Sequence, residues 1–573
     1  MKRVLFIHAA NPISEVENRY QPLWPACLAS YADRQIGPDK LEYRFLTGSL
    51  ENEIDISRPD VVAISSVTQN FSYAGEYART AKAHGVPVIM GGIHVSSIPD
   101  SLTDDMDIGC IGEGEATFAE LMGVLIETGC FDNSALAEIK GIVYRDNNVL
   151  VKTTQRSFCR SLDDLPHPNR QIIGCQSHDY MFTSRGCPYR CVFCASSQYW
   201  DKARFASATY VLEEIEELIA HDVRTISFYD DLFIADKKRL REIVGMVRER
   251  GIQHQVSFTC SCRANNVTPE IVELLRQMNV VSVGLGLESG NDRILQYLKG
   301  SVTVENNRQA VELLKDAGIQ ANASFVIGAP DETREEILQT YDFIKNSRLD
   351  FVDIYLLTPL PGTELWQYAA EKDLVSDTMD WSQLNVNFDV SSDSSIILSE
   401  TLSRKELKSL YNKFRILRIV KILKALPSSP WKSDLPNAAF NIVKEKVMRF
   451  FSKEIIRYGA AGASTTIVCW GTLLIMAELF GIHYLISVNA SAFMAYLYSY
   501  IINKRFVFMN RSKKHIKHGS KFIILQALLL LIANIMIYTG VDLIGIHYFP
   551  SVVFVAVVIT VLNYVLMKFM VFT

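Results

Sequence analysis

The sequence lacks any overall excess of positive charge. Its 573 residues include 58 Lys and Arg against 63 Asp and Glu, for a formal net charge of −5. It also lacks a long apolar run near its start, because only the apolar residues 4–7 stand between the first basic pair and His8. A nucleic-acid partner is therefore not expected, and the first residues predict a β-strand rather than a signal peptide.

The cysteines lack both zinc-site spacing and any sign of a disulfide framework. Zinc ribbons use two C-x2-C pairs and zinc fingers pair cysteines with histidines, whereas only Cys191 and Cys194 form a C-x2-C here. Cys260 and Cys262 lie inside an apolar, strand-like run and are predicted to be core residues. With no secretory signal, the eleven cysteines indicate a reducing cytosol around the soluble part. The sequence also has no Ser-His-Asp or paired-carboxylate hydrolase pattern.

What the sequence does contain is a C-x3-C-x2-C motif, formed by Cys187, Cys191 and Cys194 just after a β-like run at 180–183. A tight loop can bring three such thiols to one side of a metal cluster. Four thiolates would complete a [4Fe–4S] cubane, whereas three leave one iron open. An open iron can chelate a small molecule through an amine and a carboxylate.

The chain divides into an α/β part and a strongly apolar part. Residues up to about 400 have the pattern of a soluble α/β protein, and long apolar runs dominate from Arg457 onward. The length predicts about three to four domains. We expect a Rossmann-like, doubly wound parallel sheet, then a partial (β/α)6 TIM barrel, then a four-helix transmembrane bundle. The expected boundaries are 1–150 for the sheet, 151–179 for a linker, 180–400 for the barrel, 401–456 for a basic amphipathic bridge and 457–573 for the membrane domain.

In the first domain, short apolar runs alternate with helical patterns. Strands are expected at 4–8, 43–46, 61–65, 86–90 and 108–111, and helices at 23–32, 72–84 and 116–127. This alternation predicts a parallel sheet covered on both faces, with ligands at the carboxyl ends of its strands. Three turns at those ends would let the backbone approach a ligand closely. Their candidate residues are Ser65, Thr68, Gly91, Gly92, Gly112 and Glu113.

In the second domain, strand–helix units repeat after the linker. Strands are expected at 180–183, 225–229, 255–260, 281–287, 321–327 and 351–357, and helices at 208–221, 237–250, 269–278, 304–317 and 334–346. Six units predict a partial barrel rather than a closed one, with its chemistry at the carboxyl ends of the strands. Besides the cysteine loop, the candidate residues there are Asp230, Asp231, Arg263, Glu288, Ser289 and Gly328.

The cysteine motif, with Phe193 directly before its last cysteine, resembles the radical S-adenosylmethionine (SAM) superfamily over roughly 180–365. The resemblance implies that Cys187, Cys191 and Cys194 hold a [4Fe–4S] cluster whose open iron binds SAM. It also assigns the remaining candidates as SAM contacts: Asp230 or Asp231 at the amino group, Glu288 and Ser289 at the ribose or carboxylate, Phe193 near the adenine, Arg263 as a carboxylate clamp, and Gly328 in the fifth strand.

Three of these assignments have alternatives. Glu288 is also placed where a carboxylate could serve the start of the next helix, and Arg263 could be a structural ion-pair partner. The fifth strand departs from the family pattern G-x-I-x-G-x-x-E. Its residues Ser324, Val326, Gly328 and Asp331 stand in for the four fixed positions.

The three turns of the first domain, placed ahead of the cysteine motif, resemble the cobalamin-binding domain of cobalamin-dependent radical SAM enzymes. The loop at 8–12 lacks the D-x-H-x-x-G motif that supplies a cobalt ligand in many such domains. A bound cobalamin is therefore expected to lack a histidine from that loop, and a domain that has lost cobalamin is the alternative. His94 is a candidate ligand or a partner of its local turn. Glu113 and Glu115 either contact a ligand hydroxyl or serve as helix N-terminal charges, worth about 0.3–1 kcal/mol.

The resemblance implies radical chemistry carried by the cofactors. An electron donor such as flavodoxin or ferredoxin would reduce the cluster, and SAM would split to a 5′-deoxyadenosyl radical that abstracts hydrogen from an unactivated C–H bond. A nearby cobalamin could then donate a methyl group. The protein would mainly position its substrate and exclude water and oxygen.

A basic segment follows the barrel. Between 404 and 424 eight Lys and Arg residues stand against a single acid, Glu406, and Leu407, Leu410, Phe414, Leu417 and Val420 recur at helical spacing. Such a helix could lie on an anionic cytoplasmic leaflet. It could equally pack on the barrel with its basic face in solvent.

The last part of the chain contains four apolar segments, at about 458–480, 484–502, 522–544 and 549–567. Each is near the ~20 residues that cross a bilayer. Basic residues gather before the first segment and between the second and third, and the other two connections have none. The positive-inside rule then places both ends of the membrane domain in the cytoplasm.

The membrane domain also contains an internal repeat. Residues 481–508 align without gaps with 545–572, since both stretches open Gly-Ile-His-Tyr and both end Val-Phe. This predicts two helical hairpins packed with pseudo-symmetry. The stretch Asn-Lys-Arg-Phe-Val-Phe at 503–508 resembles the GtrA-like family of four-span proteins. That resemblance implies an association with polyprenyl-phosphate-linked sugars.

Two hypotheses for the function of the whole chain follow. The first is a membrane-tethered radical SAM enzyme that modifies a lipid or a polyprenyl-linked sugar at the cytoplasmic face. Methylation is expected if cobalamin binds, and a radical rearrangement or oxidation if it does not. The second is a lipid-linked sugar translocation module with a regulatory soluble part. The intact cysteine triplet favours the enzyme.

Overall fold

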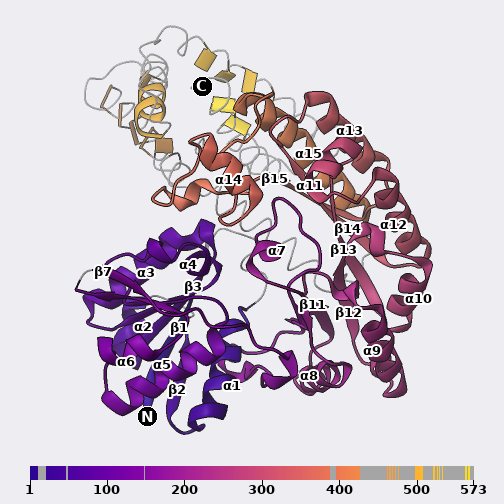
Figure 1. Ribbon diagram of the computed structural model, residues 1–573. Coiled ribbons are helices and arrows are strands. Elements are labelled where there is room, and N and C mark those ends of the chain that lie inside the picture. The colour runs from indigo at the N-terminus through magenta and orange to yellow at the C-terminus, as the bar shows by residue number, and fades with distance from the viewer. Residues whose placement is uncertain are drawn as a thin grey trace, which may run out of the picture. The chain divides into compact units, whose positions relative to one another are not determined.

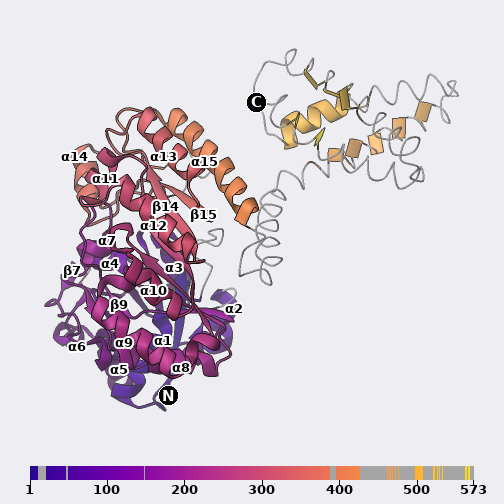
Figure 2. The ribbon, with the colours of Figure 1, turned by 90° about the vertical axis from the view of Figure 1, so that its right-hand side faces the viewer.

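The protein forms two compact units, Met1–Lys432 and Ser433–Thr573. The computed structural model describes residues 1–10, 21–46, 50–147, 149–386 and 395–425, together with scattered residues between 458 and 567. The first unit contains two large, mainly parallel sheets, one from the start of the chain and one from its middle (Figures 1 and 2). The predicted α/β class with a Rossmann-like sheet and a partial barrel is confirmed.

The N-terminal sheet has seven strands in the order β2-β1-β3-β4-β5-β6-β7. Neighbours from β2 to β5 pair in parallel, as the alternation of strands and helices predicts. The strands are β1 (Lys2–Ala9), β2 (Leu41–Phe45), β3 (Val61–Ser66), β4 (Val88–Gly91), β5 (Ile108–Cys110), β6 (Ile142–Asp146) and β7 (Val149–Lys152). All five predicted strands are present.

The last two strands of this sheet were not predicted. β6 and β7 form a hairpin that pairs antiparallel with β5. Its turn places Asn147 in the left-handed region, with φ 47°, which asparagine tolerates better than most residues. The sheet therefore continues to Lys152. The sequence did not predict this extension, because no helix separates β6 from β7.

Helices cover both faces of the N-terminal sheet. On one face, α1 (Trp24–Ile36) and α5 (Gly114–Thr128) bury alanines and large apolar side chains against β1 and β3. On the other, α2 (Leu50–Ser57) and α3 (Phe71–Ala83) do the same. Small alanines on α1 and α3 let these helices lie close to the sheet. The helices cover the two faces, so a ligand can approach at the carboxyl ends of the strands.

The second sheet has six parallel strands in the order β15-β14-β13-β12-β11-β8. It curls, with helices along its outer side, into a half-barrel (Figure 1). The strands are β8 (His178–Met181), β11 (Thr225–Phe228), β12 (Ser257–Cys262), β13 (Val280–Glu288), β14 (Gln320–Ile327) and β15 (Phe351–Leu356), and the helices between them are α8 (Ala208–Ala220), α9 (Lys237–Glu249), α10 (Pro269–Gln277), α12 (Val304–Asp316) and α13 (Arg334–Asn346). Every predicted βα unit is found.

Two helices that the sequence did not predict join the sheets. α11 (Asp292–Lys299) follows β13, and α14 (Glu364–Glu371) follows β15. Their apolar residues, such as Leu298 and Leu365, share one core with β1, β3 and α3 of the N-terminal sheet. Because they share this core, the two sheets form one compact unit rather than two separate domains joined by a linker.

The basic helix α15 (Arg404–Ala425) packs on the half-barrel. Leu407, Leu410, Phe414 and Leu417 are buried in the same core as the barrel strands, and Arg418 pairs with Asp353 of β15 at 2.9 Å. Four of the five apolar side chains predicted at helical spacing therefore face the barrel, and Val420 is the exception, because it is 40% exposed. A short strip containing Ile416, Ile419 and Val420 stays exposed beside basic residues.

The four predicted membrane segments and the internal repeat lie largely outside the described residues. No helix formed by the residues that the structure does describe is long and apolar enough to cross a bilayer.

Candidate active site

The cysteine loop begins at a short two-stranded pairing beyond β8. β9 (Ser184–Arg185) pairs antiparallel with β10 (Arg204–Phe205), and the loop runs from Gly186 to α7 (Ala195–Tyr199). Gly186 has φ +87°, and a Cβ there would press on the Trp200 side chain. Only glycine fits this start of the loop without strain.

The three motif cysteines lie on this one loop. Cys191 is buried, and Cys187 and Cys194 are half-buried. Burial raises the pKa of Cys187 to about 11, and the charges of Asp231 and of the other two cysteines add to the rise. No set of three or more His, Cys, Asp or Glu side chains stands at metal-binding spacing in the described part of the chain. The donor set nevertheless fits, because three neighbouring thiols are what a [4Fe–4S] cluster with one open iron requires.

Asp230 and Asp231 play different parts at the end of β11. Asp230 is buried and accepts hydrogen bonds from the backbone N–H groups of Thr183 and Ser184, at 2.6 and 3.0 Å, and from the Thr183 hydroxyl. It thereby fixes the turn that leads into the cysteine loop. Asp231 lines a cavity and accepts from the Ser196 hydroxyl at 2.5 Å. Of the two predicted SAM contacts, only Asp231 faces open space.

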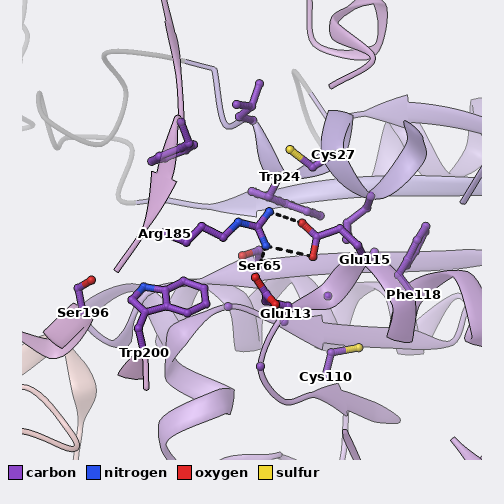
Figure 3. Close-up of a pocket in the computed structure, with 18 of the residues that line it drawn as sticks. Trp24, Cys27, Ser65, Cys110, Glu113, Glu115, Phe118, Arg185, Ser196 and Trp200 are labelled. Atoms are coloured by element: carbon purple, nitrogen blue, oxygen red, sulfur yellow. Dashed lines mark hydrogen bonds and ion pairs between the residues drawn. The ribbon is translucent and has the colours of Figure 1, made fainter. Parts of the chain in front are cut away.

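That cavity, of about 360 Å³, lies between the two sheets (Figure 3). One wall comes from the carboxyl ends of β3, β4 and β5, and the other from the start of the cysteine loop, α7 and the turn after β11. Aromatic rings line both sides, including Trp24, Phe118, Trp200 and Tyr229. The predicted cobalamin residues Ser65, Gly91, Gly92, Gly112 and Glu113 all line it.

The glycine turns shape the wall of this cavity. Gly92 has φ +97°, and a Cβ there would overlap the Ser66 carbonyl oxygen, so this turn can be made only with glycine. Gly91 has open space where its Cβ would stand. Thr68 is the exception among the predicted residues, because it is buried in a short 3-10 helix and is not among the cavity's lining residues.

Glu113 and Glu115 are tied to arginines of the half-barrel (Figure 3). Arg185 donates to Glu113 and to Glu115, each at 2.5 Å, and Arg204 donates to Glu113 at 3.0 Å. Burial alone would raise the pKa of Glu113, but the hydrogen bond from Arg204 and the charge of Arg185 hold it below its usual value. Both carboxylates therefore clamp the N-terminal sheet to the β9–β10 pairing at which the cysteine loop begins.

His94 does not line the cavity. Its ring is fully buried between Phe71 and Trp381, with centroids 4.0 and 4.6 Å away. Neither ring nitrogen has a hydrogen-bond partner among the described residues, and burial lowers the pKa of His94 to about 3. The structure gives it neither a place on the cavity wall nor the local turn hydrogen bond that the sequence suggested.

Glu288 ends β13 in a conformation that few residues adopt. Its φ is +62°, and its side chain is buried against Lys299 Nζ at 3.2 Å. The next helix is capped by Asn291 instead, whose side chain accepts from Ile294 N, so the helix-cap alternative for Glu288 is wrong. Ser289 is fully buried and bonds Thr340. A strained, buried carboxylate at a strand end is typical of a ligand site.

The remaining predicted SAM residues surround the same end of the half-barrel. Gly328 follows β14 with φ +90°, and its N–H donates to Glu332 at 2.7 Å. Arg263 is buried and donates to Cys191 Sγ at 3.3 Å. Phe193 is partly buried against the core shared by the two sheets.

Several residues of the site were not predicted from the sequence. Arg185 and Arg204 lie 72 and 91 residues from Glu113, and nothing in the spacing of opposite charges identifies such partners. Trp24 and Trp200 line the cavity but resemble ordinary core aromatics in the sequence. Arg185 alone had a possible cue, since it directly precedes Gly186 in the cysteine motif.

Comparison with known families matches three parts of the chain. The profile of the radical SAM superfamily matches residues 181–344, that of the B12 binding domain matches 13–122, and that of the GtrA/DPMS transmembrane domain matches 457–572. The three profiles fall in the order expected from the motifs. The first two correspond to the half-barrel and to the N-terminal sheet.

Individual relatives agree with these profiles. An uncharacterized methyltransferase of Pyrococcus horikoshii is 33% identical over 56% of this chain and 72% of its own length. An anaerobic magnesium-protoporphyrin IX monomethyl ester cyclase of Cereibacter sphaeroides is 26% identical over 67% of this chain and 66% of its own. Among solved structures, the radical SAM methyltransferase TsrM of Kitasatospora setae, with cobalamin and a [4Fe–4S] cluster bound, has the same fold at a TM-score of 0.58 and 18% identity, over 72% of this chain and 91% of its own.

The two walls of the cavity thus correspond to two domains that known proteins combine. The cofactors of that combination are a [4Fe–4S] cluster, SAM and cobalamin, as the sequence predicted. The chain belongs to the radical SAM enzymes that carry a B12 binding domain, and it bears a GtrA/DPMS transmembrane domain at its C-terminal end.

Proposed function

We propose that the protein is a membrane-associated methyltransferase that acts on a lipid or a polyprenyl-phosphate-linked sugar at the cytoplasmic face. One observation carries the proposal. The cavity is walled on one side by the glycine turns of the B12 binding domain and on the other by the start of the cysteine loop. A substrate carbon placed between these walls would lie within reach of both cofactor sites.

The residues divide the work between the two walls. Cys187, Cys191 and Cys194 would hold the cluster, and Ser65, Gly91, Gly92, Gly112 and Glu113 would border the cobalamin. When bound, the cluster supplies one electron for SAM cleavage and the cobalamin supplies a methyl group. The chain's own task is to orient these groups and to keep water from reactive species.

Side chains around the cavity suit that task. Asp231, which lines the cavity and accepts a hydrogen bond from the Ser196 hydroxyl, would accept another from the SAM amino group. Glu288, which lies outside the cavity lining, would accept hydrogen bonds from the ribose hydroxyls. The aromatic rings of Trp24, Phe118 and Trp200 give the walls an apolar surface that excludes water. The ion pairs of Arg185 keep the walls at a fixed separation while substrate enters.

The substrate class follows from the C-terminal domain. A GtrA/DPMS transmembrane domain would confine the catalytic unit to the bilayer, and confinement raises the effective concentration of a membrane-bound substrate. Four spans with both termini in the cytoplasm would keep the cysteines in a reducing compartment. A soluble donor such as flavodoxin or ferredoxin could then reach them.

The test uses the full chain in detergent, reconstituted with iron and sulfide under anaerobic conditions. It is incubated with a reductant, SAM carrying a deuterated methyl group, and membrane lipids from cells that lack the gene. Deuterium should appear in one lipid or lipid-linked glycan by mass spectrometry, together with 5′-deoxyadenosine. The Cys191→Ala variant should yield neither product. A wild type that holds a cluster but transfers no label would refute methylation.

A second candidate has its own support. The cyclase of Cereibacter sphaeroides carries out a reaction other than methyl transfer, so a radical oxidation or rearrangement of the same lipid class is the alternative. It predicts 5′-deoxyadenosine and a lipid whose mass changes without gain of deuterium. Cobalamin retention by the purified chain separates the two further, because methyl transfer requires it.

A further inference from the structure

Arg263 is buried directly after β12, and each of its three guanidinium nitrogens donates a hydrogen bond. It is 6% exposed. Its Nη1 donates to Cys191 Sγ at 3.3 Å, its Nη2 to the Lys299 carbonyl oxygen at 2.7 Å, and its Nε to Asn265 Oδ1 at 3.2 Å. The face of the group lies over the ring of Tyr189, 4.1 Å from its centroid. Three of its five N–H donors are therefore directed at groups of the protein.

The positive charge of Arg263 forms no ion pair with a carboxylate in the part of the chain that the structure describes. Two other buried arginines, Arg170 and Arg204, do form such pairs. Arg170 lies 2.6 Å from Glu214, and Arg204 lies 3.0 Å from Glu113. Burying a charge without a counter-charge is costly. Among the acceptors of Arg263, only the Cys191 sulfur can carry a full negative charge, because it is a thiolate whenever it ligates iron.

We propose that Arg263 is a positioning residue of the cluster: it donates a hydrogen bond to the Cys191 sulfur and is the counter-cation of the cluster. A cluster held by three thiolates gains a negative charge on reduction. A cation and a hydrogen bond at one sulfur stabilise the reduced form more than the oxidised form. Arg263 therefore makes the cluster easier to reduce by the electron donor.

The same residue links the cluster loop to the proposed SAM site. Its Nη2 holds the backbone of Lys299, whose ammonium group is 3.2 Å from Glu288. Tyr189, beneath the guanidinium, belongs to the cysteine loop and donates its hydroxyl to Asn266 Oδ1 at 2.8 Å. Arg263 thus contacts the cysteine loop through Cys191 and Tyr189. It also holds Lys299, which pairs with Glu288.

The inference rests on the cluster of the proposed function and not on the methyl transfer. The experiment compares wild type, Arg263→Gln and Arg263→Lys as full chains, reconstituted anaerobically with iron and sulfide. Bound iron and sulfide are counted, and the midpoint potential is measured by redox titration with electron paramagnetic resonance. Arg239→Lys is the matched control, since Arg239 is equally buried and also donates to backbone carbonyls, those of Thr183 and Ala206.

We expect the ratio of reduced to oxidised cluster at a fixed potential to fall at least tenfold in Arg263→Gln, which is about 59 mV for one electron. Arg263→Lys, which keeps the charge but not the planar donor, should fall between Arg263→Gln and wild type. Arg239→Lys should keep the wild-type potential. An unchanged potential in Arg263→Gln overturns the proposal, and Arg263→Lys decides in the same way if Arg263→Gln binds no iron. A wild type that assembles no cluster refutes the proposed function instead.

Discussion

The two walls of the cavity are built on different principles. The N-terminal sheet presents backbone, because Gly91, Gly92 and Gly112 border the cavity. Its two carboxylates, Glu113 and Glu115, form ion pairs with Arg185 of the opposite wall. The half-barrel presents one reactive side chain to the space, Asp231, and carries the three thiols and Glu288 outside the residues that line the cavity. Changes to the first wall should therefore act through space and strain. Changes to the second should act through chemistry.

The largest effect is expected from the thiols. Replacing Cys187, Cys191 or Cys194 by Ala should abolish cluster binding and SAM cleavage together, because a cluster that keeps one open iron needs all three ligands. Iron and sulfide analysis and 5′-deoxyadenosine production measure this. The control is Cys262→Ala, a buried core cysteine beside Cys260. Full iron content in any of the three motif variants would break the assignment.

On the other wall, space and strain can be separated at adjacent glycines. Gly91→Val adds bulk where there is room, at the cavity wall, whereas Gly92→Ala forces a left-handed residue against the Ser66 carbonyl. Both should lose cobalamin retention, by tenfold or more, while keeping the cluster. Only Gly92→Ala should also lose stability, by about 1–3 kcal/mol. Retention is read from the absorbance of the purified chain.

Gly123→Ala in α5 is the control for both, since nothing stands near its Cβ position. It should retain cobalamin and gain about 0.5–1 kcal/mol of stability. Cobalamin retention equal to wild type in Gly91→Val would place the cofactor elsewhere.

The clamp between the walls should matter for stability. Arg185→Leu leaves Glu113 and Glu115 buried with fewer partners, and removing one member of a buried pair costs about 3–5 kcal/mol. Chemical unfolding of the full chain measures the loss. The matched control is Arg250→Leu, which removes a surface pair with Glu216 and should change little. A loss of unfolding free energy no larger than that of Arg250→Leu would mean that these ion pairs do not stabilise the fold.

The sequence predicted both sheets because short buried strands alternate with amphipathic helices. It predicted the cysteines because their spacing is local. It could not predict the clamp, since Arg185 and its carboxylate partners lie 70 or more residues apart, nor the β6–β7 hairpin, whose exposed outer strand lacks apolar alternation. His94 was misjudged because its neighbour Trp381 comes from the far end of the unit.

Each domain also buries a titratable group that forms no ion pair among the described residues, and these two groups should respond to pH in opposite directions. Burial raises the pKa of Glu332 in the half-barrel to about 7. Above pH ~4.5 the unfolded chain releases this proton while the native chain keeps it. Stability should therefore fall as pH rises from about 4.5 to 7, by at most about 1.4 kcal/mol per pH unit. Unfolding of wild type and Glu332→Gln across this range measures the difference.

His94 behind the glycine wall has the opposite sign. Burial lowers its pKa from 6.5 to about 3, so between these values only the unfolded chain binds the proton. Stability should fall as pH drops through that window, with a slope of at most about 1.4 kcal/mol per pH unit. His94→Phe, which keeps an aromatic ring between Phe71 and Trp381, should remove this slope and leave the Glu332 slope intact. A variant that keeps the slope would assign it to another group.

The end of β13 has a consequence for how this protein family varies. A Cβ at Gly286 would meet the Glu288 carboxylate and the Lys299 ammonium, because the left-handed backbone at Glu288 turns its side chain back over its own strand. Both groups are the ends of flexible side chains, so a larger residue at position 286 would displace the carboxylate and the ammonium rather than disrupt the strand. Gly286 thus leaves room for this buried pair, and relatives with a larger residue at its position should place the acid and the lysine differently.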